Sequence, residues 1–111
     1  MNLIPVSRKG GKYNNQKTTY NGKEYDSKKE AKRAWELDLL LKSGNIKGYE
    51  TQPRYPIIHN GIKICTYIGD FLVTKTDGSR DLEDVKGVKT AVYVLKKKLV
   101  KAYYGIDIKE I

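Results

Sequence analysis

The sequence has little cysteine, histidine and proline, and it has no long apolar run. A single cysteine, Cys65, excludes an internal disulfide bond and a cysteine-rich zinc site. No apolar stretch is long enough to cross a membrane, and residues 1–6 are too few for a signal peptide. We therefore expect a cytoplasmic protein in which Cys65 is a small residue of the core.

Acidic residues are absent from the first 23 residues, which instead carry Arg8, Lys9, Lys12, Lys17 and Lys23. The whole chain of 111 residues has a formal net charge of +9. Such a charge favours a polyanionic partner, most often nucleic acid, and the alternative is that it serves solubility alone. Residues 1–20 show no periodicity, so we expect a flexible basic arm. Either Lys9 and Lys12 lie along a phosphate backbone, or the arm has no function.

A helix is expected to begin at Ser27. Ser27 and Glu30 form a capping box, and the Ser-Gly-Asn run at 43–45 ends the helix. Glu30 falls within the apolar stripe of the helical wheel, so its carboxylate either serves the cap, has a functional role, or does both. Trp35 and Leu39 form a second apolar patch, which needs the basic arm or another subunit as a partner. We favour a homodimer.

Two hairpins are expected in the middle of the chain, after a strand at 46–52. Asn60-Gly61 joins residues 56–59 to residues 62–66, and Asp77-Gly78 joins a strand at 62–74 to a strand at 79–87. His59, beside the first turn, is expected to be a solvated loop residue.

The second hairpin carries the main functional hypothesis. Its strands run antiparallel, so Asp70 comes opposite residues 83–86. Asp84 and Lys86 share a face because side chains alternate along a strand. Two carboxylates and an ammonium group would therefore converge on one patch.

A second helix is expected between Thr90, as its cap, and Gly105, as its stop. Its apolar stripe would consist of Val92, Leu95, Leu99, Ala102 and Tyr103. The lysines in and just before this helix form either a solvated face or a phosphate-binding surface, with Lys89, Lys96, Lys97 and Lys101 as candidates. With a last strand at 107–111, the order of elements predicts one α/β domain over residues 21–111. Its small mixed sheet would be flanked by helices.

The acids of the second hairpin suit a particular cation. Mg²⁺ favours one or two carboxylates together with water and phosphate oxygens, and Asp70 and Asp84 would supply the carboxylates. The Val85 carbonyl would be a further ligand, and Glu30 would complete the shell. Lys86 would orient or deprotonate the attacking water and offset negative charge in the transition state. The alternative is an ordinary exposed strand, on which an acid and a lysine two residues apart are common.

The runs YIGDF at 67–71 and EDVKG at 83–87, with Glu30 on an upstream helix, resemble the core of the PD-(D/E)XK nuclease superfamily. Together with KYNNQKT, YDSKKEAKRAWEL and QPRY, they resemble a family of small, mostly phage-encoded proteins of unknown function. The resemblance implies a restriction-endonuclease-like core close to the Holliday-junction-resolvase branch. In that reading Asp70 and Asp84 are metal ligands, Lys86 is the catalytic lysine and Glu30 is the helix glutamate.

Two positions depart from the superfamily pattern. Gly69 stands where the superfamily name has proline, and Asp84 stands where glutamate is more frequent. The neighbouring Glu83 is a second candidate acid, but strand alternation turns it away from Lys86 and favours Asp84.

The sequence therefore predicts a Mg²⁺-dependent DNA endonuclease, with Mn²⁺ able to substitute. By analogy, the substrate would be branched DNA and the role would be DNA recombination, in the host cytoplasm if the protein is phage-encoded. No sequence-reading module is evident, which favours recognition of backbone and shape. The alternative is a non-catalytic module that binds nucleic acid or a host factor and retains the nuclease fold.

Overall fold

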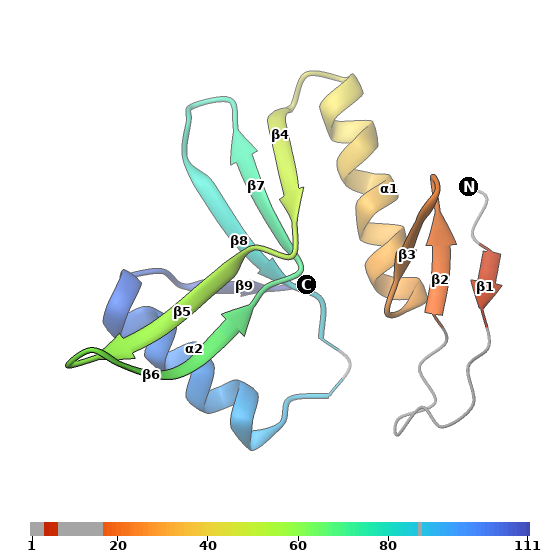
Figure 1. The fold of residues 1–111 in the computed structure, drawn as a ribbon. Helices are drawn as coiled ribbons and strands as arrows, with labels where there is room; N and C mark the ends of the chain where they lie inside the picture. Colours follow the sequence, from red (N-terminus) through yellow and green to blue (C-terminus); the bar gives the residue numbers. More distant parts are fainter. Residues whose placement is uncertain (1–3, 7–16, 87) are drawn as a thin grey trace. The chain divides into compact units, whose positions relative to one another are not determined.

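The computed structural model describes residues 4–6, 17–86 and 88–111, and for residues 4–6 it describes the backbone alone. These residues form a mixed α/β structure with two helices and small sheets (Figure 1). The chain divides into two compact units, residues 1–45 and 46–111, and each is described by itself. This division lies inside the range 21–111 that we expected to be one domain. No helix in the described part of the chain is long and apolar enough to cross a membrane.

The N-terminal unit contains an antiparallel sheet with the strand order β1-β2-β3. Its strands are β1 (Ile4–Val6), β2 (Lys17–Tyr20) and β3 (Lys23–Tyr25). The Asn21-Gly22 turn, with φ of 52° and 78°, lets β2 pair with β3. β1 and β2 lie within residues 1–20, where we expected a flexible arm. The run at residues 17–20 pairs with β3 across this turn.

Helix α1 (Lys28–Lys42) follows this sheet. The Ser27 hydroxyl accepts a hydrogen bond from the Glu30 N–H at 3.1 Å, which confirms the predicted start of the helix. The buried face of α1 includes Glu30, as the wheel predicted, beside Ala31, Ala34 and Leu37. The Tyr20 hydroxyl donates to Asp38 at 2.6 Å and ties β2 to α1. That hydrogen bond is the largest of the effects that raise the pKa of Tyr20 to about 12.

The C-terminal unit is built on a mixed sheet with the strand order β4-β7-β8-β9. Its strands are β4 (Ile46–Thr51), β7 (Phe71–Lys75), β8 (Arg80–Asp84) and β9 (Ile108–Glu110). The first three run antiparallel, while β9 runs parallel to β8 because α2 (Ala91–Tyr104) forms the crossover between them. The expected small mixed sheet is confirmed.

The strand expected at 62–74 is in fact two strands. β6 ends at Ile68 and pairs with β5 in a separate hairpin, while β7 begins at Phe71; β5 is Arg54–His59 and β6 is Ile62–Ile68. At the break, the Gly69 N–H donates to the Pro53 carbonyl and the Gln52 N–H donates to the Asp70 carbonyl, each at 3.0 Å. Gln52, which lies between β4 and β5, has a φ of 52°, so the chain also bends there. The apolar run itself does not indicate this bend, because hydrogen bonds to residues 52 and 53 fix it.

The core of the C-terminal unit lies between the sheet, the β5–β6 hairpin and α2, as the elements in Figure 1 are arranged. Its buried members are Ile57, Tyr67, Leu72, Leu82, Tyr93, Val100 and Ile108. The predicted apolar stripe of α2 is therefore wrong in part. Val92 and Leu95 are 62% and 57% exposed, because the face with Tyr93 and Val100 turns toward the sheet. The predicted ends hold, with Thr90 as N-cap and Gly105 in the left-handed conformation at the C-cap.

The first prediction concerns the bend. A Cβ atom on Gly69 would lie 2.7 Å from Cδ1 of Leu82, which is fully buried and has little freedom to move. We expect Gly69→Ala to lower the free energy of unfolding by about 1–3 kcal/mol, the usual effect of overpacking. Chemical denaturation would measure the loss. Gly48→Ala is the matched control, because nothing lies within 4 Å of its added Cβ. Equal stability of the two variants would contradict this account of the bend.

Candidate active site

The bend places Asp70 against the end of β8. The Asp70 N–H donates to the Glu83 carbonyl at 3.0 Å, and one carboxylate oxygen of Asp70 accepts from the Val85 N–H at 2.6 Å. These two bonds hold Asp70 opposite residues 83–85, as the turn at 77–78 predicted. Asp70 therefore reaches Asp84 from the neighbouring strand.

Asp84 is the last residue of β8, and it is almost completely buried, with 3% of its surface exposed. The Tyr67 hydroxyl donates a short hydrogen bond to one oxygen of the carboxylate. The other oxygen lies 3.0 Å from the ammonium nitrogen of Lys86. Both oxygens of the Asp84 carboxylate therefore have a partner, one the Tyr67 hydroxyl and the other the Lys86 ammonium group.

Strand alternation separates the two adjacent acids of β8. Glu83 is as buried as Asp84, at 1% exposed, and it lies opposite Phe71 in the register of β7 and β8. Asp84 contacts Lys86, with 3.0 Å between a carboxylate oxygen and the ammonium nitrogen. Of the two candidate acids, the structure therefore brings Asp84 to the lysine.

Asp70 has an unusual electrostatic environment. Burial is the largest effect that raises the pKa of Asp70, and the hydrogen bond from Val85 opposes it. The charge of Asp84 and a hydrogen bond with it raise the pKa further, whereas the charge of Lys86 lowers it. The resulting pKa is about 7, so one ammonium group does not fully compensate the carboxylate pair.

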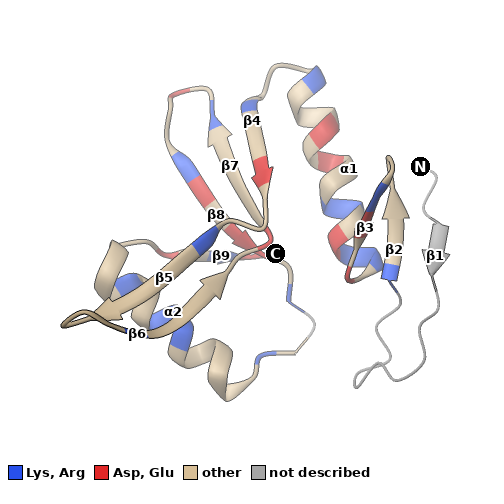
Figure 2. Ribbon diagram, in the orientation of Figure 1, with Lys and Arg blue, Asp and Glu red and all other residues tan. Residues whose placement is uncertain are grey.

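Basic residues recur along α2 and the segment before it (Figure 2). Of those that we expected to bind phosphate, Lys89, Lys96 and Lys97 contact acceptors within their own unit. Lys89 and Lys97 pair with Glu110 at 3.1 and 3.4 Å, and Lys96 donates to the Thr66 carbonyl at 3.2 Å. A hydrogen bond from the Tyr93 hydroxyl and, with smaller effects, the contacts with Lys89 and Lys97 lower the pKa of Glu110 to about 2. Exposed pairs of this kind are weak, so the lysines can still exchange partners with a phosphate.

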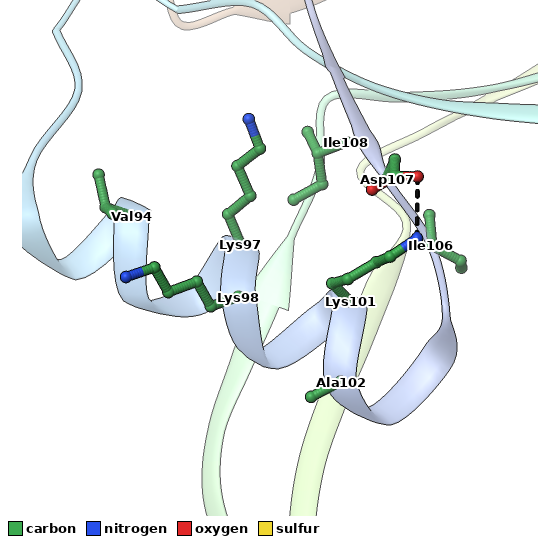
Figure 3. A pocket seen from close by; sticks show the side chains of 8 residues that line it. All are labelled: Val94, Lys97, Lys98, Lys101, Ala102, Ile106, Asp107 and Ile108. Carbon is green, nitrogen blue, oxygen red and sulfur yellow. Dashed lines mark hydrogen bonds and ion pairs between the residues drawn. The ribbon is translucent and has the colours of Figure 1, made fainter.

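Lys101 lies beside a pocket of about 520 Å³ between α2 and the segment that leads into β9 (Figure 3). It pairs with Asp107 at 2.9 Å. The lysines at this pocket surround apolar side chains; the residues that line it are Val94, Lys97, Lys98, Lys101, Ala102, Ile106, Asp107 and Ile108. The pocket therefore lies beside the lysine-bearing face of α2.

Three predicted site residues remain: Glu30, Lys9 and Lys12. Glu30 is buried in the N-terminal unit. Lys9 and Lys12 lie outside the described residues. Within residues 17–86 and 88–111, no three histidine, cysteine or acidic side chains come together as a metal-binding group. In the C-terminal unit, Asp70, Asp84 and Lys86 form a cluster at the bend.

Sequence reasoning missed two aromatic residues of this cluster. The Tyr67 hydroxyl is bonded to Asp84, and the ring of Tyr93 lies 3.9 Å from the Lys86 ammonium nitrogen. Their only sequence signal is position, since Tyr67 lies three residues before Asp70 and Tyr93 lies in the first turn of α2.

The comparison with protein families identifies the chain. A family model described as "Protein of unknown function (DUF1064)" matches residues 10–110. The chain belongs to this family. The match spans both helices and every residue of the cluster, and it confirms the expected membership of a family of unknown function. No curated protein and no solved structure matches the chain.

The second prediction follows from the raised pKa of Asp70. Between its ordinary value of 3.8 and about 7, the folded protein keeps a proton that the unfolded chain has released. The free energy of unfolding of the metal-free protein should therefore fall as the pH rises through this window. We expect Asp70→Asn to remove much of this fall, because its amide oxygen still accepts from Val85 without a charge.

Denaturation between about pH 5 and about pH 8, with a chelator present, measures this dependence. Asp81→Asn is the control, because Asp81 is an acid of β8 that pairs with Lys75 at 3.2 Å, away from the cluster. An unchanged slope in Asp70→Asn would show that Asp70 is not the group that titrates.

Proposed function

We propose that this protein is a metal-dependent DNA endonuclease that hydrolyses phosphodiester bonds. The observation that carries the proposal is the grouping of Asp70, Asp84 and Lys86 at the bend, with Lys86 3.0 Å from Asp84. The element order supports the proposed restriction-endonuclease-like core of the PD-(D/E)XK superfamily. In that order α1 precedes the three antiparallel strands of the mixed sheet, β4, β7 and β8, with the β5–β6 hairpin between β4 and β7. Then come α2 and the parallel strand β9.

The donors at the bend fit a hard divalent cation. Two carboxylates are the set that Mg²⁺ takes when water and phosphate oxygens complete its shell, and Mn²⁺ would accept the same donors. The raised pKa of Asp70 fits as well, because a cation would relieve the repulsion between the two carboxylates. Asp70, Asp84 and the Val85 carbonyl would hold the ion. When bound, it would polarise the scissile phosphate and acidify a water molecule.

The side chains of the chain would supply the remaining chemistry. Lys86 would place its ammonium group beside the phosphate and stabilise negative charge as it develops on the phosphate oxygens. Tyr67 would hold Asp84 in one orientation through its hydroxyl. Glu30 would complete the site from α1, as the resolvase-like branch suggests, and this role rests on the resemblance alone.

A DNA substrate is favoured by the charge of the chain. The net charge of +9 and the lysines of α2 would contact phosphates, with Lys89, Lys96, Lys97 and Lys101 exchanging their present partners for the backbone. Lys9 and Lys12 would extend this surface. A preference for branched DNA and a role in recombination follow from analogy. Action as a homodimer follows from the apolar patch of α1, where Leu39 is 47% exposed.

A non-catalytic nucleic-acid-binding module is the second candidate. One contact favours it, because Lys86 already neutralises Asp84 and Tyr67 satisfies the other oxygen. In such a protein the cluster would only stabilise the bend. The raised pKa of Asp70 favours the nuclease instead, since a purely structural network would have no need for a second, partly buried carboxylate beside Asp84.

The third prediction tests catalysis directly. We expect the wild-type protein to cut DNA with Mg²⁺ or Mn²⁺ and not with a chelator, on a four-way junction, a flap or a linear duplex. Asp84→Asn and Lys86→Met should each lower the cleavage rate by about 100-fold or more, because each removes a charge at the reacting phosphate. Asp81→Asn, an acid on the same strand, should cut at the wild-type rate.

DNA affinity separates the two candidate functions. Asp84→Asn should bind DNA at least as tightly as the wild type, because it removes a negative charge near the phosphates. Binding without cleavage of any of the three substrates, in either metal, would overturn the nuclease and leave the binding module.

A further inference from the structure

The position of Lys86 is not set by strand pairing. β8 ends at Asp84, so Lys86 lies two residues beyond the last paired residue of the strand. Its ammonium nitrogen is 3.0 Å from Asp84 and 3.9 Å from the centre of the Tyr93 ring. The side chain is about three-quarters buried, with 24% of its surface exposed. An ammonium group over an aromatic face is attracted by the ring, and this attraction strengthens where water is excluded.

Tyr93 is itself held by two hydrogen bonds, one at its backbone and one at its hydroxyl group. Its backbone N–H donates to the Thr90 hydroxyl at 3.1 Å, in the cap of α2. Its hydroxyl donates to Glu110 on β9 at 2.8 Å. Glu110 in turn lies between Lys89 and Lys97, so its carboxylate is kept charged and in place. The Tyr93 side chain is buried, with 6% of the residue exposed, and its ring cannot turn away without breaking the hydrogen bond to β9.

We propose that Tyr93 is a positioning residue for Lys86, and that its ring face keeps the ammonium group beside Asp84. The proposal rests on the proposed function for the part that Lys86 plays in cleavage. Packing in the core keeps the ring face toward Lys86, and the hydrogen bond to Glu110 only adds to this. Through this contact α2 and β9 fix the position of Lys86, which the pairing of β8 does not fix.

A simpler role for Tyr93 is that of a core residue, since it packs with Leu82, Val100 and Ile108. The two roles make different demands on the side chain. A core role needs an apolar group of about the right volume, whereas a positioning role needs an aromatic face. Tyr93→Phe keeps the face and loses only the hydroxyl bond to Glu110, and Tyr93→Leu loses the face.

The experiment compares these two variants with the wild type in two readouts. The first is the NMR shift of the Lys86 ε-methylene protons in metal-free protein, which a ring face beneath them moves upfield of the exposed lysines. We expect the upfield shift in the wild type and in Tyr93→Phe, and its loss in Tyr93→Leu. This readout needs neither metal nor DNA.

The second readout is cleavage of DNA in saturating Mg²⁺. Tyr93→Leu should lower kcat by about 10- to 100-fold, with KM for DNA changed by about threefold or less, because the lysine is misplaced and the binding surface is not. Tyr93→Phe should stay within about threefold of the wild-type kcat. Mn²⁺ affinity should be similar in all three proteins, because Asp70 and Asp84 are unchanged.

The outcomes separate the positioning role from the proposed function. No upfield shift of Lys86 in the wild type overturns the proposal without reference to any variant, even if Tyr93→Leu does not fold. Equal kcat for folded Tyr93→Leu and Tyr93→Phe overturns it while the nuclease stands. If no protein cuts DNA but the shift is lost only in Tyr93→Leu, the contact is supported and the nuclease is overturned.

Discussion

Two carboxylates share a buried corner of the sheet, and the rest of the C-terminal unit is arranged around that constraint. Asp84 is buried and Asp70, at the bend just before β7, lies partly buried beside it, so ionising both carboxyl groups costs free energy. Such a pair is unfavourable unless hydrogen bonds and a cation compensate it. The Val85 N–H, the Tyr67 hydroxyl and the Lys86 ammonium group supply part of that compensation. A divalent cation would supply the rest.

The bend that creates this corner also explains a departure from the superfamily pattern. Gly69 donates its N–H to Pro53, a bond that a proline at this position would lose. A Cβ at the same position would meet Leu82. Glycine therefore meets two requirements at once, a backbone donor and a close approach of the chain to the core. The chain can then leave the β5–β6 hairpin and enter the mixed sheet as β7, with Asp70 at the bend between β6 and β7.

Local patterns in the sequence were sufficient for much of this arrangement. Ser27 and Thr90 cap their helices as predicted, and Asp77-Gly78 fixes a hairpin that brings Asp70 to Asp84. Strand alternation also chose Asp84 over Glu83 for the contact with Lys86. These predictions succeed because turns, caps and alternation depend on residues that are close together in the chain.

Features that depend on distant parts of the chain could not be predicted in the same way. The break at Gly69 is set by hydrogen bonds to residues 52 and 53 on another strand. The face of α2 that is buried is chosen by the sheet, which selects Tyr93 over the more apolar Val92 and Leu95. Glu110 lies more than a dozen residues from Tyr93, and nothing near either residue indicates their hydrogen bond. The aromatic support of Lys86 therefore becomes visible only in the structure.

Titration of the metal-free protein with Mn²⁺ in a calorimeter, at about pH 6, tests most directly whether the carboxylate corner is a cation site. Two buffers of different ionisation enthalpy would show whether protons leave on binding. The account predicts binding with proton release, because Asp70 is largely protonated below its pKa of about 7. It also predicts loss of binding in Asp70→Asn and wild-type binding in Asp81→Asn. Absence of binding by the wild type, or equal binding by Asp70→Asn, would contradict it.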